Sequence, residues 1–171
     1  MSGAAARTRN VLFLCTGNSA RSILAEALLE HRGGARGFRG FSAGSFPKRE
    51  VHPLALKLLD ERGLRLADPR SKSWDEFARP GAPAMDFVFT VCDQAAGEVC
   101  PVWPGTPVTA HWGVADPAAA DGSESRRMAA FRDALQLLDR RIQLFLALPL
   151  EQLDTVTLAR HAAENGKMRD G

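Results

Sequence analysis

The chain has 171 residues, of which 45% are apolar and 25% are charged, and its formal net charge is +2. A chain of this length and apolar content can bury one domain core without a metal or disulfide bonds. Its basic residues are spread out and no apolar run approaches the roughly 20 residues of a membrane span, so we expect neither a nucleic-acid nor a membrane partner.

The first predicted elements are a strand and a helix that enclose a short loop. Residues 11–14 read Val-Leu-Phe-Leu, which is typical of a buried strand, and residues 1–9 are expected to form a flexible N-terminus. Apolar positions recur with a helical period over residues 23–31, before two glycines end the pattern. Residues 15–22 therefore connect the end of a strand to the start of a helix.

This loop reads Cys-Thr-Gly-Asn-Ser-Ala-Arg-Ser. The first N–H groups of a helix have no partner within it, and the helix dipole adds partial positive charge at the same point. Gly17 lets the backbone curl with its amides inward, and Arg21 offers a planar fork of donors for two oxygens. We predict a site for phosphate or a similar oxyanion, with these substrate-binding residues: Thr16, Gly17, Asn18, Ser19, Ala20 and Arg21.

Cys15 lies at the floor of this loop. A helix N-terminus and a nearby guanidinium both favour the thiolate form, and Ser22 can donate a further hydrogen bond to the sulfur. An inert buried thiol is the alternative, but such a thiol needs neither Gly17 nor Arg21 beside it. We therefore predict that Cys15 is a nucleophile, with Arg21 and Ser22 as catalytic partners.

Five further elements are predicted before residue 113. Residues 38–43 form a second strand, and residues 53–59 form a helix that begins at a proline. Ser73 and Glu76 have the spacing of a capping box for a short helix. Residues 85–91 and 108–112 are predicted as the third and fourth strands.

The C-terminal part of the chain is predicted to be helical. From residue 125 onward, apolar residues draw one long amphipathic helix: Met128, Phe131, Leu135, Leu138, Ile142 and Phe145. Residues 150–163 are predicted to form a last helix that lies on the domain surface. Strands separated by helices predict an α/β fold, a small four-stranded parallel sheet with helices on both faces and ligands beyond the carboxyl ends of the strands.

Two further polar groups are expected at that edge of the sheet. Cys92 directly follows the third strand, so it should lie at the same edge as Cys15. Asp116 and Pro117 follow the fourth strand, which places the carboxylate near the anion site, although Asp-Pro is also a common turn initiator.

Four segments, in this order and spacing, resemble the low-molecular-weight protein tyrosine phosphatase superfamily: the loop 15–22, FSAG at 41–44, FVFTVCDQAAGEVCP at 87–101 and HWGVADP at 111–117. Within it, the chain is more similar to the thioredoxin-coupled arsenate reductases. The likeness covers residues 10–148, the predicted phosphatase-like domain, and leaves 149–171 as a helical extension. It implies the flavodoxin-like layout of that superfamily.

The resemblance also implies a reaction, the reduction of arsenate to arsenite. In it Cys15 attacks arsenate, for which phosphate and sulfate are mimics, and Asp116 is the general acid. Cys92 then attacks Cys15 and releases arsenite, Cys100 attacks Cys92, and thioredoxin reduces the final disulfide. Seven residues separate Cys92 from Cys100 where the best-known relatives have six, so glutaredoxin or a low-molecular-weight thiol stays open as the electron donor.

Other readings of these residues remain open. Cys92 and Cys100 can be buried structural thiols, while a zinc site is not expected because two cysteines and a distant histidine are too few ligands. We expect no cofactor, but Asn18, Glu26 and Ser42 match residues that, in some relatives, shape the loop or help hold a potassium ion. With three cysteines, too few for a secreted disulfide scaffold, we expect a cytoplasmic protein.

The alternative enzyme is a protein tyrosine or small phosphomonoester phosphatase that uses Cys15, Arg21 and Asp116, with the extra cysteines protecting Cys15 from oxidation. A third possibility is an anion-binding regulatory domain. Pro117 is followed by two alanines rather than aromatic residues, and the chain has no tyrosine. We therefore expect a bare rim suited to a small inorganic anion.

Overall fold

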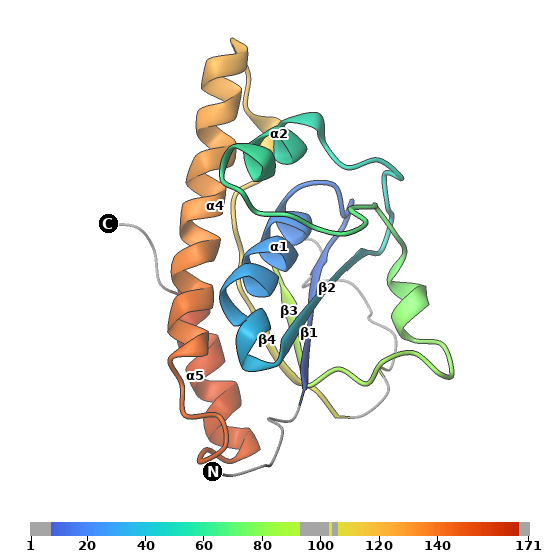
Figure 1. The fold of residues 1–171 in the computed structure, drawn as a ribbon, viewed down its shortest axis with the longest axis vertical. Helices are drawn as coiled ribbons and strands as arrows, with labels where there is room; N and C mark the ends of the chain where they lie inside the picture. The colour runs from blue at the N-terminus through green and yellow to red at the C-terminus, as the bar shows by residue number, and fades with distance from the viewer. Residues whose placement is uncertain (1–7, 93–102, 104–105, 168–171) are drawn as a thin grey trace.

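A four-stranded parallel sheet forms the centre of the computed structural model, which describes residues 8–92, 103 and 106–167 (Figure 1). The strands are β1 (Arg9–Cys15), β2 (Phe38–Gly44), β3 (Phe87–Thr90) and β4 (Val108–His111), in the order β2-β1-β3-β4. β1 pairs with both β2 and β3 and is therefore central. This confirms the predicted parallel, flavodoxin-like fold.

The two faces of the sheet carry different cores, because alternate residues of a strand point to opposite faces. Val11 and Phe13 of β1 pack in the larger core with α1 (Arg21–Gly33), α2 (Pro53–Glu61), α4 (Glu124–Leu146) and α5 (Thr155–Lys167). Leu12 and Leu14 face the smaller core, which contains Phe77, Met85 and Trp103. Among the described residues, the short 3₁₀ helix η2 (Trp74–Phe77) covers this second face and contributes Phe77 to the smaller core.

The longest helix is α4, which runs along much of the molecule (Figure 1). Ser123 caps it by accepting a hydrogen bond from the backbone N–H of Arg126. All six apolar residues predicted for its inner face are buried. Phe145 meets the rings of Phe87 and Phe89 edge-on, with centroids 4.8 and 5.3 Å apart, so the helix is fixed against the middle of the sheet.

Helix α5 packs along β4 and α4 and contributes to the core. The indole N–H of Trp112 donates to the carbonyl of Ala162 at 2.9 Å, and Ala162 is 1% exposed. Gly166 lies so close to β4 that a Cβ atom there would clash with the carbonyl of His111. The helix is thus part of the packed structure, whereas the sequence predicted a helix that only lies on the surface. The division into a domain at residues 10–148 and an extension at residues 149–171 stays a prediction.

Several element boundaries differ from those predicted. β1 already begins at Arg9, which pairs with Phe38, so the expectation of a flexible chain through residue 9 is wrong at that residue. α5 begins five residues later than predicted, where Asp154 accepts from the N–H of Thr157. The sheet pairing and the aspartate cap, rather than the apolar pattern, set these two starts.

The predicted capping box is wrong in one half. Ser73 does cap η2, by accepting from the N–H of Asp75, but the Glu76 carboxylate forms two hydrogen bonds with Arg70 instead of returning to the Ser73 backbone. A charged bidentate pair outweighs a single bond to an amide.

Among the described helices, none has the length and hydropathy that crossing a membrane requires.

Candidate active site

The loop between β1 and α1 is held in its curve by bonds to its carbonyl oxygens. The carbonyl of Thr16 accepts from the N–H of Phe46, that of Gly17 from the N–H of Lys48, and that of Ser19 from the N–H of His52, all at 2.8 to 2.9 Å. These donors all lie between β2 and α2. With its carbonyls held from outside, the loop keeps a fixed curl at the N-terminus of α1.

Asn18 adopts the left-handed backbone conformation, with φ of 44°, and is completely buried. Its side chain stabilises this conformation. The backbone N–H of Lys72 donates to Asn18 Oδ1 at 2.8 Å, and Asn18 Nδ2 donates to Ser22 Oγ at 2.7 Å. Because the first bond identifies the oxygen of the amide, the second identifies Ser22 Oγ as an acceptor.

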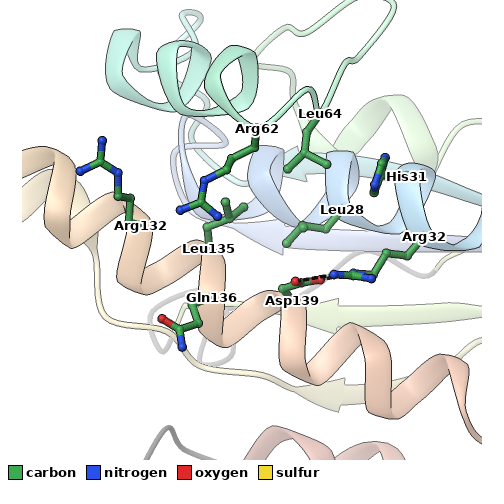
Figure 2. Close-up of a pocket in the computed structure, with 9 residues that line it drawn as sticks. All are labelled: Leu28, His31, Arg32, Arg62, Leu64, Arg132, Leu135, Gln136 and Asp139. Carbon is green, nitrogen blue, oxygen red and sulfur yellow. Dashed lines mark hydrogen bonds and ion pairs between the residues drawn. The ribbon is translucent and has the colours of Figure 1, made fainter.

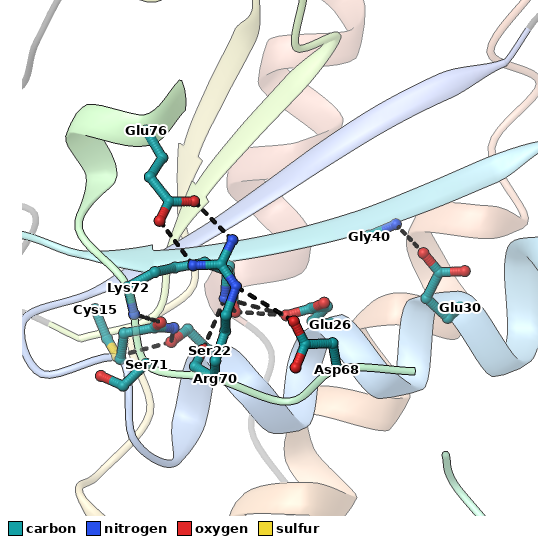
Figure 3. Close-up of polar contacts among 12 residues, drawn as sticks. Cys15, Ser22, Glu26, Glu30, Gly40, Asp68, Arg70, Ser71, Lys72 and Glu76 are labelled. Carbon is teal, nitrogen blue, oxygen red and sulfur yellow. Dashed lines mark hydrogen bonds and ion pairs between the residues drawn. The ribbon is translucent and has the colours of Figure 1, made fainter. Parts of the chain in front are cut away.

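This orientation of Ser22 bears directly on Cys15. Cys15 Sγ lies 2.9 Å from Ser22 Oγ and the residue is 3% exposed (Figure 3). Since Ser22 Oγ accepts from Asn18, its own hydrogen is available to the sulfur. A hydroxyl that donates to sulfur stabilises the thiolate, which is the nucleophilic form of cysteine.

Arg21 and Asp116 face each other across the mouth of the loop. Arg21 Nη1 donates to the carbonyl of Val114 at 2.8 Å, and Nη2 lies 3.8 Å from Asp116 Oδ2. Asp116 Oδ1 accepts from the N–H of Ala118, which places the aspartate at the N-cap of the 3₁₀ helix η3 (Pro117–Ala119). Asp116 is therefore both the expected turn residue and a group at the site.

A cavity of about 180 Å3 lies above Cys15. Most of the predicted site residues line it: Cys15, Thr16, Gly17, Ser19, Ala20, Arg21 and Asp116. Phe46 and Lys48 also line it, although the sequence did not predict them. Phe46 is 71% exposed, so the expectation of a rim without aromatic rings is wrong. Both missed residues follow β2, a neighbour of β1, and the carboxyl ends of neighbouring parallel strands share one edge.

Cys92 lies next to the same loop. Its sulfur accepts a hydrogen bond from the N–H of Thr16 at 3.3 Å and lies 3.6 Å from Thr16 Oγ1. Cys15 and Cys92 are both in the reduced, thiol form, and Cys92 is 2% exposed. The second predicted thiol thus contacts the residue that directly follows the first, while Cys100 lies outside the described residues.

A buried polar cluster lies behind the loop (Figure 3). Ser42 Oγ donates to Glu26 Oε1 at 2.5 Å, and Lys72 Nζ donates to Ser42 Oγ at 3.2 Å. Burial raises the pKa of Glu26 above its usual value and lowers that of Lys72. Glu26 and Ser42, two of the three residues expected to hold potassium, therefore lie beside the Lys72 ammonium group. Within the described residues, no set of three His, Cys, Asp or Glu side chains is placed to hold a metal.

Another cavity, of about 440 Å3, lies between α1 and α4, away from the loop (Figure 2). Its lining includes Leu28, Arg32, Arg62 and Arg132. Arg32 is engaged by the carboxylate of Asp139. None of the predicted site residues lines this cavity, so the smaller one above Cys15 is the candidate active site.

Comparison with known proteins identifies relatives over most of the chain. Residues 10–157 match the model of the low molecular weight phosphotyrosine protein phosphatase family. The arsenate reductase of Halalkalibacterium halodurans is 35% identical over 140 residues, which are 79% of this chain and 93% of the relative.

Solved structures of arsenate reductases are also similar to the chain. The thioredoxin-dependent arsenate reductase of Corynebacterium glutamicum is 30% identical with a TM-score of 0.61, and the alignment covers 87% of this chain and 66% of that one. For the arsenate reductase of Archaeoglobus fulgidus the identity is 30%, the TM-score 0.60, and the coverage 78% and 95%.

Proposed function

Because the chain belongs to the low molecular weight phosphotyrosine protein phosphatase family, we propose that it uses that family's oxyanion loop to reduce arsenate to arsenite. The observation that carries the proposal is the placement of Cys92, whose sulfur contacts Thr16 immediately beside Cys15. A phosphatase needs one nucleophilic thiol at this place, whereas a two-electron reduction needs a second one.

The first step is attack by the Cys15 thiolate on arsenic. An As–S bond forms and one arsenate oxygen leaves as water, with Asp116 as the proton donor. Arg21 and the loop amides bind the remaining oxygens. The 2.9 Å contact between Cys15 and Ser22 and the position of Asp116 on the cavity wall support these roles.

The second step is attack by the Cys92 thiolate on Cys15 Sγ. An S–S bond forms, the S–As bond breaks, and its electron pair stays on arsenic, which passes from the +5 to the +3 state and leaves as arsenite. The two thiolates supply the two electrons and become a disulfide. The contact of Cys92 Sγ with Thr16, the residue next to Cys15, supports this step.

The disulfide must then be reduced by an external thiol. We propose thioredoxin as that donor, since the similar Corynebacterium enzyme is thioredoxin-dependent, and Cys100 as the thiol that passes the disulfide on. Glutaredoxin or a low-molecular-weight thiol is the alternative donor. Such a cycle suits the cytoplasm, where thiols are kept reduced.

A phosphatase is the second candidate, and Phe46 favours it. The ring stands 71% exposed on the wall of the cavity, where it can stack on an aryl phosphate. Weak hydrolysis of aryl phosphates is expected in either case, because phosphate and arsenate have the same shape.

The deciding experiment compares Cys92→Ser with the wild type in two assays. One follows NADPH consumption with arsenate, thioredoxin and thioredoxin reductase, and the other follows hydrolysis of an aryl phosphate. We expect the variant to lose at least about 100-fold in arsenate turnover and to keep aryl phosphate hydrolysis within about threefold, because only reduction needs the second thiol.

Cys15→Ser is the control and should lose both activities. Retained arsenate turnover in Cys92→Ser would contradict the proposal. A wild type that hydrolyses the aryl phosphate but does not turn over arsenate would point to the phosphatase.

A further inference from the structure

The ammonium group of Lys72 is buried among oxygen atoms behind the oxyanion loop (Figure 3). The residue is 8% exposed. Its Nζ donates to the carbonyl of Arg70 at 2.9 Å and to Ser42 Oγ at 3.2 Å, and it lies 3.9 Å from Glu26 Oε1. A carboxylate, a hydroxyl and a carbonyl together form the kind of oxygen set that surrounds a hard metal cation.

These residues do not fit a potassium ion while Lys72 is present. Glu26 and Ser42, two of the groups expected to bind one, contact the ammonium instead. The third, Asn18, uses both ends of its amide, one for Ser22 and one for the backbone of Lys72. The positive charge that such a site calls for is already supplied by the chain.

We propose that the Lys72 ammonium is a built-in cation of the oxyanion loop, which holds the loop in its binding conformation without dissolved potassium. The inference rests on the proposed function only in that the loop binds the reacting oxyanion. Lys72 does not touch the cavity above Cys15, so it is a positioning residue.

The link from Lys72 to the nucleophile is a chain of hydrogen bonds. The ammonium ties the segment 70–72 to β2 through Ser42 and to α1 through Glu26. From this anchored segment the Lys72 backbone N–H donates to Asn18, Asn18 donates to Ser22, and Ser22 meets Cys15. If the ammonium is removed, Glu26 keeps a buried charge without its cation, and the segment that orients Asn18 loses an anchor.

The test measures the affinity for inorganic phosphate by calorimetry, in potassium chloride and in tetramethylammonium chloride at equal ionic strength. We expect the wild type to bind equally in both salts. Lys72→Met should bind about tenfold more weakly in tetramethylammonium and recover in potassium, which can enter between Glu26 and Ser42. A cavity of about 590 Å3, lined by Glu26 and Lys72 among others, gives the ion a route.

Two further variants sharpen the test. Lys57→Met removes an exposed lysine that is paired with Glu124, and it should leave phosphate affinity unchanged in both salts. The double variant Glu26→Gln with Lys72→Met should lose the rescue by potassium, because the carboxylate that would hold the ion is gone.

Three results would overturn the inference. The first is a phosphate affinity of Lys72→Met that equals the wild-type value in tetramethylammonium. The second is a loss of phosphate affinity in Lys72→Met that is equal in both salts, which would make the role of Lys72 purely structural. The third is a wild type that binds phosphate more tightly in potassium than in tetramethylammonium, and this measurement can be made even if Lys72→Met and the milder Lys72→Gln do not fold. Because phosphate is the probe, the inference stands or falls independently of arsenate reduction.

Discussion

At the scale of single residues, the hydroxyl of Ser22 is the group that most directly tunes the nucleophile. It accepts from Asn18 and lies 2.9 Å from Cys15 Sγ. In Ser22→Ala the sulfur loses this hydrogen-bond donor, so we expect alkylation of Cys15 at pH 7 to slow by about fivefold. The measurement is the rate of iodoacetamide labelling at pH 7, followed on the Cys15 peptide by mass spectrometry.

Ser71→Ala is the matched control. Its hydroxyl donates to the carbonyl of Gly17 and so contacts the loop without reaching the sulfur. Its rate of Cys15 alkylation should stay at that of the wild type. An equal loss of rate in both variants would mean that the loop as a whole, and not the Ser22 hydroxyl, governs the reactivity of Cys15.

The residues of the loop itself could be predicted from the sequence because their roles follow from local spacing. Cys15, Arg21 and Ser22 are set by one strand end and one helix start. Phe46 and Lys48 could not be predicted in this way, because their place on the cavity wall depends on how the chain after β2 folds back onto the loop. The same holds for Lys72, whose partners come from two other elements.

At the scale of elements, the packing of β2 against the loop depends on Gly44. A Cβ atom there would clash with the carbonyl of Thr16 and crowd Asn18. We therefore expect Gly44→Ala to lower the free energy of unfolding by about 2 kcal/mol, measured by urea denaturation, and to weaken phosphate binding.

Gly34→Ala is the control for this change. Gly34 has a helical backbone, with φ of −56°, and a Cβ atom there meets nothing within 4 Å. That variant should be neutral or slightly more stable than the wild type, since alanine restricts the unfolded chain. If Gly44→Ala is as stable as Gly34→Ala, the loop is less tightly packed than the structure indicates.

At the scale of the whole molecule, the docking of α5 closes the core over Trp112. The indole is completely buried, stacks on Phe89 with centroids 4.0 Å apart, and bonds to the carbonyl of Ala162. Gly166→Ala would place a methyl group against the carbonyl of His111 and push the helix away. We expect a loss of about 2 kcal/mol in unfolding free energy and a red shift of tryptophan fluorescence.

Glu164→Ala serves as the control on the same helix. Its side chain is 59% exposed and its carboxylate lies 3.7 Å from His161 Nδ1, a surface pair that contributes little to stability. We expect stability and fluorescence close to those of the wild type. A Gly166→Ala variant with an unchanged spectrum would show that α5 can shift without uncovering Trp112.

The overall fold was predictable because apolar periodicity marks strands and helices directly. The six inner residues of α4 and the buried run of β1 follow this pattern. The docking of α5 was not predictable, because it depends on one glycine fitting against a strand about fifty residues earlier in the chain. Long-range contacts of this kind leave no periodic trace in the sequence.

The burial of both sulfurs limits how electrons can enter the proposed cycle. Cys15 and Cys92 are 3% and 2% exposed, and the hollow above Cys15 holds only about 180 Å3. A folded redox protein is far too large to enter such a space, so a Cys15–Cys92 disulfide would be insulated from it. Reducing equivalents would then have to arrive by relay through another thiol of the chain, or from a donor about the size of a small peptide.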